Sequence, residues 1–230
     1  MERKRVMGSR AGIKEALSAL RRGGVIVYPT ETFYALGADP RKRSALKKLR
    51  RLKGRGSSKP LLLIASSRRQ ALSLVQAPHS RRLRALTRRF WPGPLTLILP
   101  PKNSGLSRSL GRSDGLALRL TSQPLARRLI RSFGFPITGT SANPTGCAPA
   151  RRAARAAGSF RSDLDGILDG GHTHGGKAST LVDLTGSPPI LRRAGPISLS
   201  ALRSVVPDMT PASGHSPRWH RRASRRPKRA

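Results

Sequence analysis

The chain is poor in acidic residues, aromatic residues and cysteine. It has 10 Asp and Glu residues against 46 Lys and Arg residues, so its formal net charge at pH 7 is +36. A positive field of this size attracts RNA and other polyanions, although drift in composition explains it equally well. Aromatic residues make up only 4% of the chain, yet hydrophobic residues reach 37% and come in dense blocks, which is enough for one core.

Other absences exclude whole classes of protein. The single cysteine, Cys147, excludes an internal disulfide framework. No apolar run reaches the roughly 18 residues that a membrane-spanning helix needs. No apolar segment of signal-peptide type follows the charged first residues. We therefore expect a soluble, cytoplasmic protein with no membrane partner.

Common nucleotide and metal motifs are also missing. The sequence has no Walker A motif and no Gly-x-Gly-x-x-Gly fingerprint. His172 and His174 flank Thr173 in a glycine-rich stretch, but no nearby cysteine completes a metal site, which favours a loop. Cys147 has no paired histidine motif, which disfavours a nucleophilic cysteine.

The apolar pattern alternates between helical and strand-like segments. Helical spacing or capping residues predict helices over 11–22, 41–52, 68–75, 80–90 and 125–133, and Asp39 and Pro40 are expected as N-cap and first residue of the second. Short apolar runs predict strands over 25–28, 61–65, 95–99, 116–120, 136–140, 166–169, 179–184 and 190–192. This alternation predicts an α/β fold with an open, twisted, mixed sheet flanked by helices.

The last part of the chain has a different composition. Residues 213–230 contain seven Arg or Lys residues, no acid and little apolar content. Such a segment cannot bury enough apolar surface to fold, so we predict a disordered basic tail over 207–230 after one domain over 8–206.

Two short motifs carry the chemistry of a triphosphate site. Lys53 and Arg55 can direct two cations toward one polyanion, since Lys gives a compact charge and Arg a planar fork of donors. Ser141 and Asn143 are separated by one small residue, so in an extended backbone both can face one ligand. In so basic a chain, the alternative for Lys53 and Arg55 is a solvated helix end.

Several blocks in one order resemble the YrdC-like threonylcarbamoyl-AMP synthases from about residue 23 to residue 197. The blocks are residues 24–32 (GVIVYPTET), 53–55 (KGR) with 59–61 (KPL), 91–96 (WPGPLT), 116–119 (LALR), 140–143 (TSAN), 179–183 (STLVD) and 191–193 (LRR). The resemblance implies an open α/β fold with a basic concave face. It also implies a nucleotidyltransferase that makes threonylcarbamoyl-AMP and pyrophosphate from L-threonine, bicarbonate and ATP. A separate threonylcarbamoyl transferase complex then modifies an adenosine of tRNA.

The resemblance also assigns roles to single residues. It makes Lys53 and Arg55 the catalytic cations that neutralise the phosphates. The implied ATP-binding residues are Lys53, Arg55, Lys59, Ser141, Asn143 and Arg193. The implied threonine-binding residues are Thr32, Arg119, Ser179 and Thr180.

Each role has an alternative. Thr32 could serve only the bend after Pro29, and Asn143 could serve only a turn with Pro144. Arg119 is the one charge inside an apolar strand, so it is either exposed to a ligand or paired with one of the acids. Arg192 and Arg193 are adjacent, which leaves open which of them reaches the nucleotide.

Two further features bear on the substrates. Ile64 occupies a position where some relatives of that family carry a histidine, so this chain could lack one interaction with threonine. The resemblance predicts Mg²⁺ as a cofactor bound mainly through ATP and water, because the sequence offers no carboxylate cluster. The rival functions are an RNA-binding or ribosome-associated module that depends on the charge and the tail, and a relative that has drifted to another carbamoylation. The expected partners include tRNA.

Overall fold

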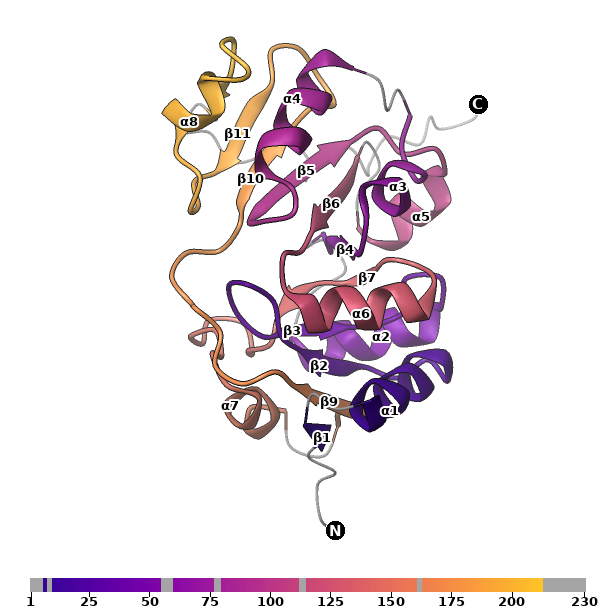
Figure 1. Ribbon diagram of the computed structural model, residues 1–230. Coiled ribbons are helices and arrows are strands. Elements are labelled where there is room, and N and C mark those ends of the chain that lie inside the picture. Colours follow the sequence, from indigo (N-terminus) through magenta and orange to yellow (C-terminus); the bar gives the residue numbers. More distant parts are fainter. Residues whose placement is uncertain are drawn as a thin grey trace, which may run out of the picture.

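The strands of this protein lie in two sheets. The computed structural model describes residues 6–7, 10–54, 60–76, 80–111, 115–160 and 163–212. Within these ranges, one sheet has five strands and the other has seven. Figure 1 shows the five-stranded sheet in the lower half of the molecule and the seven-stranded sheet in the upper half. The α/β class with mixed sheets is confirmed, and the strands are shared between two sheets.

The five-stranded sheet has the order β1-β9-β2-β3-β8. Its strands β1, β9 and β2 run parallel, while β3 is antiparallel to both β2 and β8. The strands are β1 (Val6–Met7), β2 (Ile26–Tyr28), β3 (Ala35–Gly37), β8 (Thr140–Ser141) and β9 (Gly166–Asp169).

The seven-stranded sheet has the order β12-β11-β10-β5-β6-β4-β7. Both parallel pairs (β4 with β6, β5 with β10, β11 with β12) and antiparallel pairs (β5 with β6, β10 with β11, β4 with β7) occur in it. Its strands are β4 (Leu63–Ala65), β5 (Leu95–Leu99), β6 (Leu116–Leu120), β7 (Ile137–Thr138), β10 (Thr180–Asp183), β11 (Ile190–Arg193) and β12 (Thr210–Pro211).

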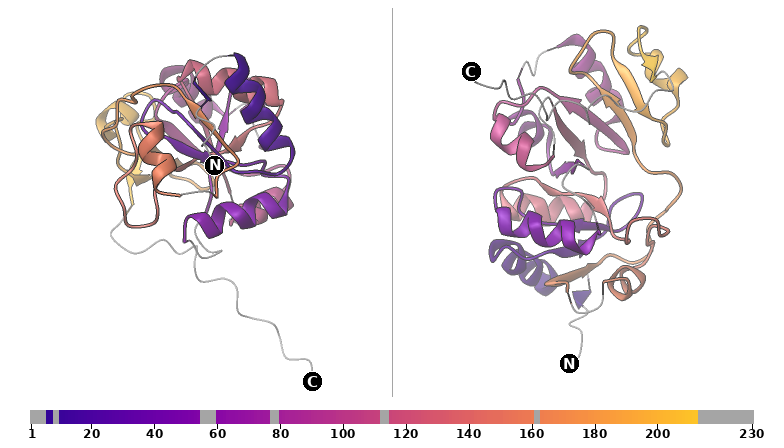
Figure 2. Two further views of the ribbon diagram at one scale, coloured as in Figure 1. Left: turned by 90° about the horizontal axis from the view of Figure 1, so that it is seen from below. Right: turned by 180° about the vertical axis from the view of Figure 1, so that it is seen from behind.

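Helices cover both sheets. Figures 1 and 2 show α1, α2 and α6 beside the five-stranded sheet, and α4 and α5 beside the seven-stranded sheet. The helices are α1 (Arg10–Arg21), α2 (Arg43–Leu52), α3 (Arg68–Leu72), α4 (Arg81–Phe90), α5 (Ser104–Ser109), α6 (Pro124–Phe133), α7 (Ala153–Gly158) and α8 (Leu199–Arg203). Helix α6 shows why the sequence pattern works: Pro124 starts it, and Gly134, with φ of +83°, ends it.

The strands are continuous apolar runs because both of their faces are buried. Along β2, Val27 packs in the larger core cluster, while its neighbours Ile26 and Tyr28 pack in the cluster under α1 and α6. All three side chains are fully buried. Burial on two faces explains why a run without polar alternation predicts a strand here.

The two sheets meet where β7 passes into β8. Gly139 lies between these strands, and its N–H donates to the carbonyl of Leu62 at 3.0 Å. A Cβ atom at Gly139 would lie 2.4 Å from the side chain of Ile64, so only glycine fits without a shift. A second crossing, residues 170–179, leads from β9 to β10 along one side of the molecule (Figure 1).

Two predicted boundaries are wrong. Helix α2 begins at Arg43, after Lys42, and not near Pro40. Asp39 instead accepts hydrogen bonds from the backbone and the guanidinium of Arg41, so it closes a separate turn. The predicted end of the domain at residue 206 is also too early, because Met209 is fully buried and the N–H of Ala212 donates to the β11 carbonyl of Leu191. The rest of the predicted tail, residues 213–230, lies outside the described residues.

Candidate active site

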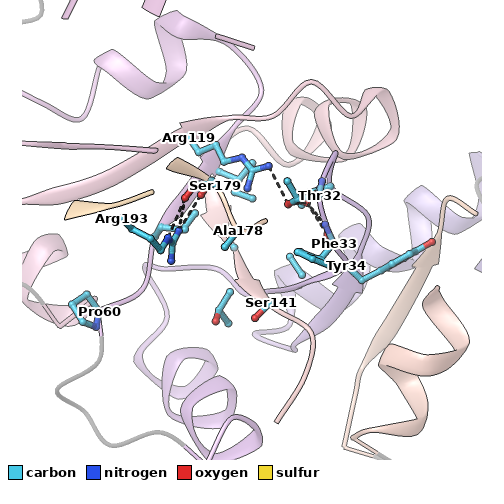
Figure 3. A pocket seen from close by; sticks show the side chains of 15 residues that line it. Thr32, Phe33, Tyr34, Pro60, Arg119, Ser141, Ala178, Ser179 and Arg193 are labelled. Atoms are coloured by element: carbon cyan, nitrogen blue, oxygen red, sulfur yellow. Dashed lines mark hydrogen bonds between the residues drawn. The ribbon is translucent and has the colours of Figure 1, made fainter. Parts of the chain in front are cut away.

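One pocket at the junction of the two sheets collects five of the ten predicted site residues. Its volume is about 150 Å³. Figure 3 shows its side chains converging from the β2–β3 turn, β6, the β7–β8 crossing and the start of β10. Its lining residues are Thr30, Thr32, Phe33, Tyr34, Ala35, Pro60, Leu62, Ile64, Arg119, Gly139, Thr140, Ser141, Ala178, Ser179 and Arg193. These lining residues include two arginines and no carboxylate, which suits an anionic ligand.

The β2–β3 turn presents Thr32 to the pocket. The hydroxyl of Thr30 donates to the carbonyl of Phe33 at 2.6 Å and accepts from the N–H groups of Thr32 and Phe33. The hydrogen bonds that close this turn are therefore made by the Thr30 hydroxyl, and not by that of Thr32. The hydroxyl of Thr32 lies 3.2 Å from that of Thr30 and 3.4 Å from Nη2 of Arg119, facing the cavity.

Arg119 is buried, lines the pocket and forms an ion pair. Its Nη2 lies 2.7 Å from Oε1 of Glu31, and its Nε donates to the same oxygen at 3.1 Å. The other carboxylate oxygen of Glu31 accepts from the hydroxyl of Thr121. Both alternatives for Arg119 thus hold geometrically, since it is paired with an acid and also faces the ligand cavity.

Ser179 and Arg193 form another part of the pocket wall. The guanidinium of Arg193 donates to the carbonyl of Ser179 at 2.9 and 3.1 Å and to its hydroxyl at 3.2 Å. The Ser179 hydroxyl also lies 2.8 Å from that of Thr96 on β5. Arg192 turns away and pairs with Asp183 at 3.0 Å. The structure therefore brings Arg193, and not Arg192, to the pocket.

Lys53 lies behind the pocket, at the end of α2. Its ammonium is buried and donates to the carbonyls of Ser141, at 2.8 Å, and Asn143. The carbonyl of Lys53 accepts in turn from the N–H and the hydroxyl of Thr145. The side-chain amide of Asn143 donates to the carbonyls of Pro144 and Cys147, which shapes the same loop. Lys53 and Asn143 thus support the loop that carries Ser141.

Of the three other predicted site residues, only Thr180 belongs to the described part of the chain, and it does not line the pocket. Arg55 and Lys59 lie outside the described residues, and their roles stay predictions. Thr180 is fully buried, and its hydroxyl accepts from the N–H of Ile197 and donates to its carbonyl. It therefore ties β10 to the segment before α8. Its neighbour Ser179 is the residue that lines the cavity.

Ile64 gives the pocket an apolar wall. Its side chain is buried and lies against Gly139, beside Leu62 and Pro60. An isoleucine cannot form a hydrogen bond to a ligand hydroxyl, whereas Thr32 and Ser179, the predicted threonine-binding hydroxyl residues on the pocket, can.

Sequence reasoning missed three residues near the pocket. Glu31 and Thr121 complete the Arg119 network, and Tyr34 lines the cavity. The Tyr34 hydroxyl lies 2.6 Å from the carbonyl of Gly171, and burial raises the pKa of Tyr34 above its usual value, so it stays a neutral phenol. Glu31 stood inside the block that pointed to the site, but nothing in the sequence named its partner.

The other candidate features remain apart from the pocket. His172 is exposed, and its pKa is lowered first by desolvation and then by the charges of Arg151, Arg152 and His174. Cys147 is an exposed free thiol. Among the described residues, no group of three or more His, Cys, Asp or Glu side chains could hold a metal ion. No helix in the same residues is long and apolar enough to cross a membrane.

Comparison with known proteins identifies the family. The Sua5/YciO/YrdC family model, described as telomere recombination, matches residues 18–195. Proteins named threonylcarbamoyl-AMP synthase from Bacillus subtilis and Thiobacillus denitrificans are 37% and 42% identical to the chain over 195 and 177 residues. These alignments cover 84% and 76% of this chain, and 56% and 93% of the two relatives.

The solved structures agree. The structure of Pyrococcus abyssi Sua5 complexed with L-threonine matches with a TM-score of 0.82 at 33% identity, covering 91% of this chain and 61% of that one. The chain thus spans little more than half of the Bacillus and Pyrococcus proteins. A family model that covers residues 18–195, with the pocket residues from Thr32 to Arg193 inside it, places this chain in the Sua5/YciO/YrdC family.

Proposed function

We propose that this chain is an L-threonylcarbamoyladenylate synthase, a nucleotidyltransferase that uses L-threonine, bicarbonate and ATP. The observation that carries this proposal is the single pocket in which Thr32, Arg119, Ser141, Ser179 and Arg193 converge (Figure 3). Support comes from relatives named threonylcarbamoyl-AMP synthase and from the threonine complex of the Pyrococcus protein. The activity is inferred from the shared domain alone, because the chain spans 56% of the Bacillus protein.

The threonine end of the pocket is assigned to the wall formed by the β2–β3 turn and β6. Arg119 offers a planar guanidinium that fits a carboxylate with two parallel hydrogen bonds. Thr32, next to it, offers a hydroxyl. The apolar side chain of Ile64 lies on the same cavity and gives a methyl group a surface to pack on.

The nucleotide end is assigned to Ser141 and Arg193, and Ser179, predicted to bind threonine, lies against Arg193. Arg193 reaches the pocket from β11, and Ser141 from β8, so the two bracket the cavity from different sheets. Lys53 and Asn143 support the Ser141 loop, and Arg55 and Lys59 are proposed as further cations for the triphosphate. Cations that are already in position when the reaction starts stabilise the charge that develops at the α-phosphorus and on departing pyrophosphate.

The proposed reaction needs no covalent intermediate with the protein. The threonine nitrogen attacks the bicarbonate carbon, and loss of water gives N-carboxythreonine. A carboxylate oxygen of that group attacks the α-phosphorus of ATP, and the bond from the α-phosphorus to the bridging oxygen breaks. Pyrophosphate leaves with the electron pair. The contribution of the protein is positioning of the two substrates and stabilisation of charge.

Mg²⁺ is proposed to arrive with ATP. The described residues do not provide a cluster of carboxylate and histidine ligands that would fit a resident ion. A triphosphate supplies its own oxygen ligands for Mg²⁺, and water completes the coordination. The protein residues then act on the substrate phosphates directly, through Arg193 and the lysine and arginine proposed beside it.

Two partners belong to the proposal. Threonylcarbamoyl-AMP is an activated mixed anhydride, so a separate threonylcarbamoyl transferase complex is proposed to consume it and to modify tRNA. Direct binding of tRNA to this chain is proposed from its net charge of +36. The rival function, an RNA-binding module without synthesis, explains the charge but not the pocket, since RNA binding alone requires no such converging side chains.

The test is a pyrophosphate assay on the purified chain. Release should require L-threonine, bicarbonate and ATP together, and ¹⁴C-bicarbonate should appear in a product that also carries the adenosine group. Buffer freed of carbon dioxide supplies the control without bicarbonate. Pyrophosphate release at the same rate without threonine would contradict the substrate assignment, and RNA binding without any release would favour the rival.

A further inference from the structure

Glu31 joins the two sheets at the pocket. It lies in the β2–β3 turn of the five-stranded sheet, whereas its partner Arg119 lies on β6 of the seven-stranded sheet. Oε1 of Glu31 lies 2.7 Å from Nη2 of Arg119 and accepts from its Nε at 3.1 Å. Oε2 accepts from the buried hydroxyl of Thr121, just beyond the end of β6. Both carboxylate oxygens are therefore engaged.

The ion pair fixes one edge of the guanidinium. Glu31 holds Nε and Nη2, and the hydroxyl of Thr32 lies 3.4 Å from Nη2. No described residue accepts a hydrogen bond from Nη1. Because a guanidinium is planar, holding one edge sets the direction of the other donors as well. Arg119 lines the pocket but Glu31 does not, so the carboxylate holds the guanidinium from outside the cavity lining.

We propose that Glu31 is a positioning residue, which with Thr121 aligns Arg119 in advance to receive the carboxylate of the amino-acid substrate. This inference rests on the proposed function. A long side chain that is already fixed loses less conformational entropy on binding, and this is the source of the affinity that Glu31 supplies. Glu31 also balances the buried charge of Arg119 in the absence of a ligand.

Two other roles for Glu31 predict different results. If the pair only stabilised the fold, its removal would lower the melting temperature and leave threonine affinity unchanged. If Glu31 competed with the substrate for Arg119, its removal would tighten threonine binding. Positioning predicts weaker threonine binding with little change in nucleotide affinity, because Arg193 and Ser141 belong to other strands.

The experiment measures L-threonine binding by calorimetry without nucleotide, and ATP binding separately. Glu31→Ala should weaken threonine binding about tenfold or more. Glu31→Gln should weaken it less, roughly threefold, since the amide oxygen still accepts from Arg119 but carries no charge. Thr121→Val should fall between Glu31→Gln and the wild type, and Thr121→Ser should restore wild-type binding. ATP affinity should stay within about twofold in all of them.

A matched ion pair supplies the control. Asp183 and Arg192 form another ion pair, at 3.0 Å, with Asp183 buried and neither residue on the pocket. Asp183→Asn should lower the melting temperature and leave threonine affinity unchanged. In an Arg119→Lys background, Glu31→Ala should weaken binding little further, because the two residues act as one unit.

The outcomes separate the two proposals. Unchanged or tighter threonine binding in Glu31→Ala would overturn the positioning role while the proposed function stands. Failure of the wild-type chain to bind threonine would overturn the proposed function itself. If Glu31→Ala does not fold, Glu31→Gln and the two Thr121 variants decide. Wild-type affinity for threonine in all three variants contradicts positioning. Weakening that is largest in Glu31→Gln, smaller in Thr121→Val and absent in Thr121→Ser supports it.

Discussion

Two buried cations, Arg119 on the pocket and Lys53 beneath the loop that carries Ser141, have different partners. Arg119 faces a full negative charge on Glu31 at 2.7 Å. Lys53 faces the backbone carbonyls of Ser141 and Asn143 and the side-chain oxygen of Asn143, none of which carries a formal charge. Both side chains are almost completely buried, at 5% and 2% exposure.

The difference in partners indicates what each of the two cations, Arg119 and Lys53, does at the site. The Arg119–Glu31 pair is close to neutral, so its value for a ligand depends on the direction of its donors. The described contacts of Lys53 are with carbonyl and amide oxygens, which orient its ammonium and hold the loop that carries Ser141. Lys53 thus acts on the loop that carries Ser141, while Arg119 offers directed donors to a single carboxylate.

The largest effect should come from the Lys53 side. Lys53→Ala should lower kcat/KM about 10²-fold or more, since stabilisation of phosphoryl charge is worth a few kcal/mol. It should also lower the free energy of unfolding by roughly 2 kcal/mol, because buried carbonyls lose a charged donor. Steady-state kinetics and urea unfolding measure the two effects.

Arg55→Ala is the matched variant for that experiment. It should lower kcat/KM by a similar factor of about 10², as expected for a second phosphate cation. Near wild-type turnover in both Lys53→Ala and Arg55→Ala would mean that the triphosphate binds away from these two residues. Lower stability in Lys53→Ala with unchanged turnover would make Lys53 a support of the loop alone.

A smaller effect is expected on the Arg119 side. Arg119→Lys keeps the charge but loses the planar fork, so the KM for threonine should rise about tenfold while the KM for ATP changes little. Initial rates at varied threonine and saturating ATP, and the reverse, measure the two constants. An equal rise in the KM for threonine and the KM for ATP would mean that Arg119 serves both substrates. The contrast between Arg119 and Lys53 would then fail.

Arg192 and Arg193 give an internal comparison on β11. Arg193→Ala should weaken ATP binding several-fold, on the order of 1 kcal/mol, because its guanidinium lines the pocket. Arg192→Ala should leave ATP binding unchanged and cost at most a modest amount of stability, since its partner Asp183 loses an ion pair. ATP titration of both variants measures this, and equal weakening in both would indicate a general effect of charge.

The parts of the fold that could be predicted are those with a local cause. β2, β5 and β6 are apolar runs buried on every residue, and α6 has its own start and stop residues. β3 was not predicted, because three residues, Ala35–Gly37, carry no period and depend on pairing with β2 and β8. The short helices α5, α7 and α8 were missed for the same reason.

The site residues divide in the same way, into those with a local sequence signal and those that depend on distant contacts. Thr32, Arg119, Ser141, Ser179 and Arg193 belong to ordered motifs, and the fold brings them to one pocket. Alternation along a strand explains two ambiguities, since neighbouring side chains point to opposite faces. Ser179 faces the cavity and Thr180 does not, just as Arg193 faces it and Arg192 does not.

Glu31 could not be predicted, because its role depends on distance in space. Its partners Arg119 and Thr121 lie 88 and 90 residues along the chain and in the other sheet. Polar spacing near Glu31 suggests only a turn. A residue of this kind becomes visible only when the two sheets are seen together.

The smallest effect on turnover is expected from the tail, and two truncations test it. Removal of residues 213–230 takes seven basic residues from the chain but leaves every pocket residue in place. Threonine- and ATP-dependent turnover should therefore stay near the wild-type rate. If RNA binds this segment, the log–log salt dependence of RNA affinity should become flatter by roughly 0.7 to 0.9 for each phosphate that the shortened chain no longer neutralises.

Removal of residues 207–230 is the matched truncation, because it also takes Met209 and β12. Met209 is fully buried, so this chain should be less stable by about 2 kcal/mol than the chain that ends at residue 212. Urea unfolding of the two truncations isolates that contribution, because both lack the same basic residues. Equal stability would mean that the segment after Val206 adds nothing to the fold. Slower turnover in the chain that ends at residue 212 would instead place part of the basic segment at the active site.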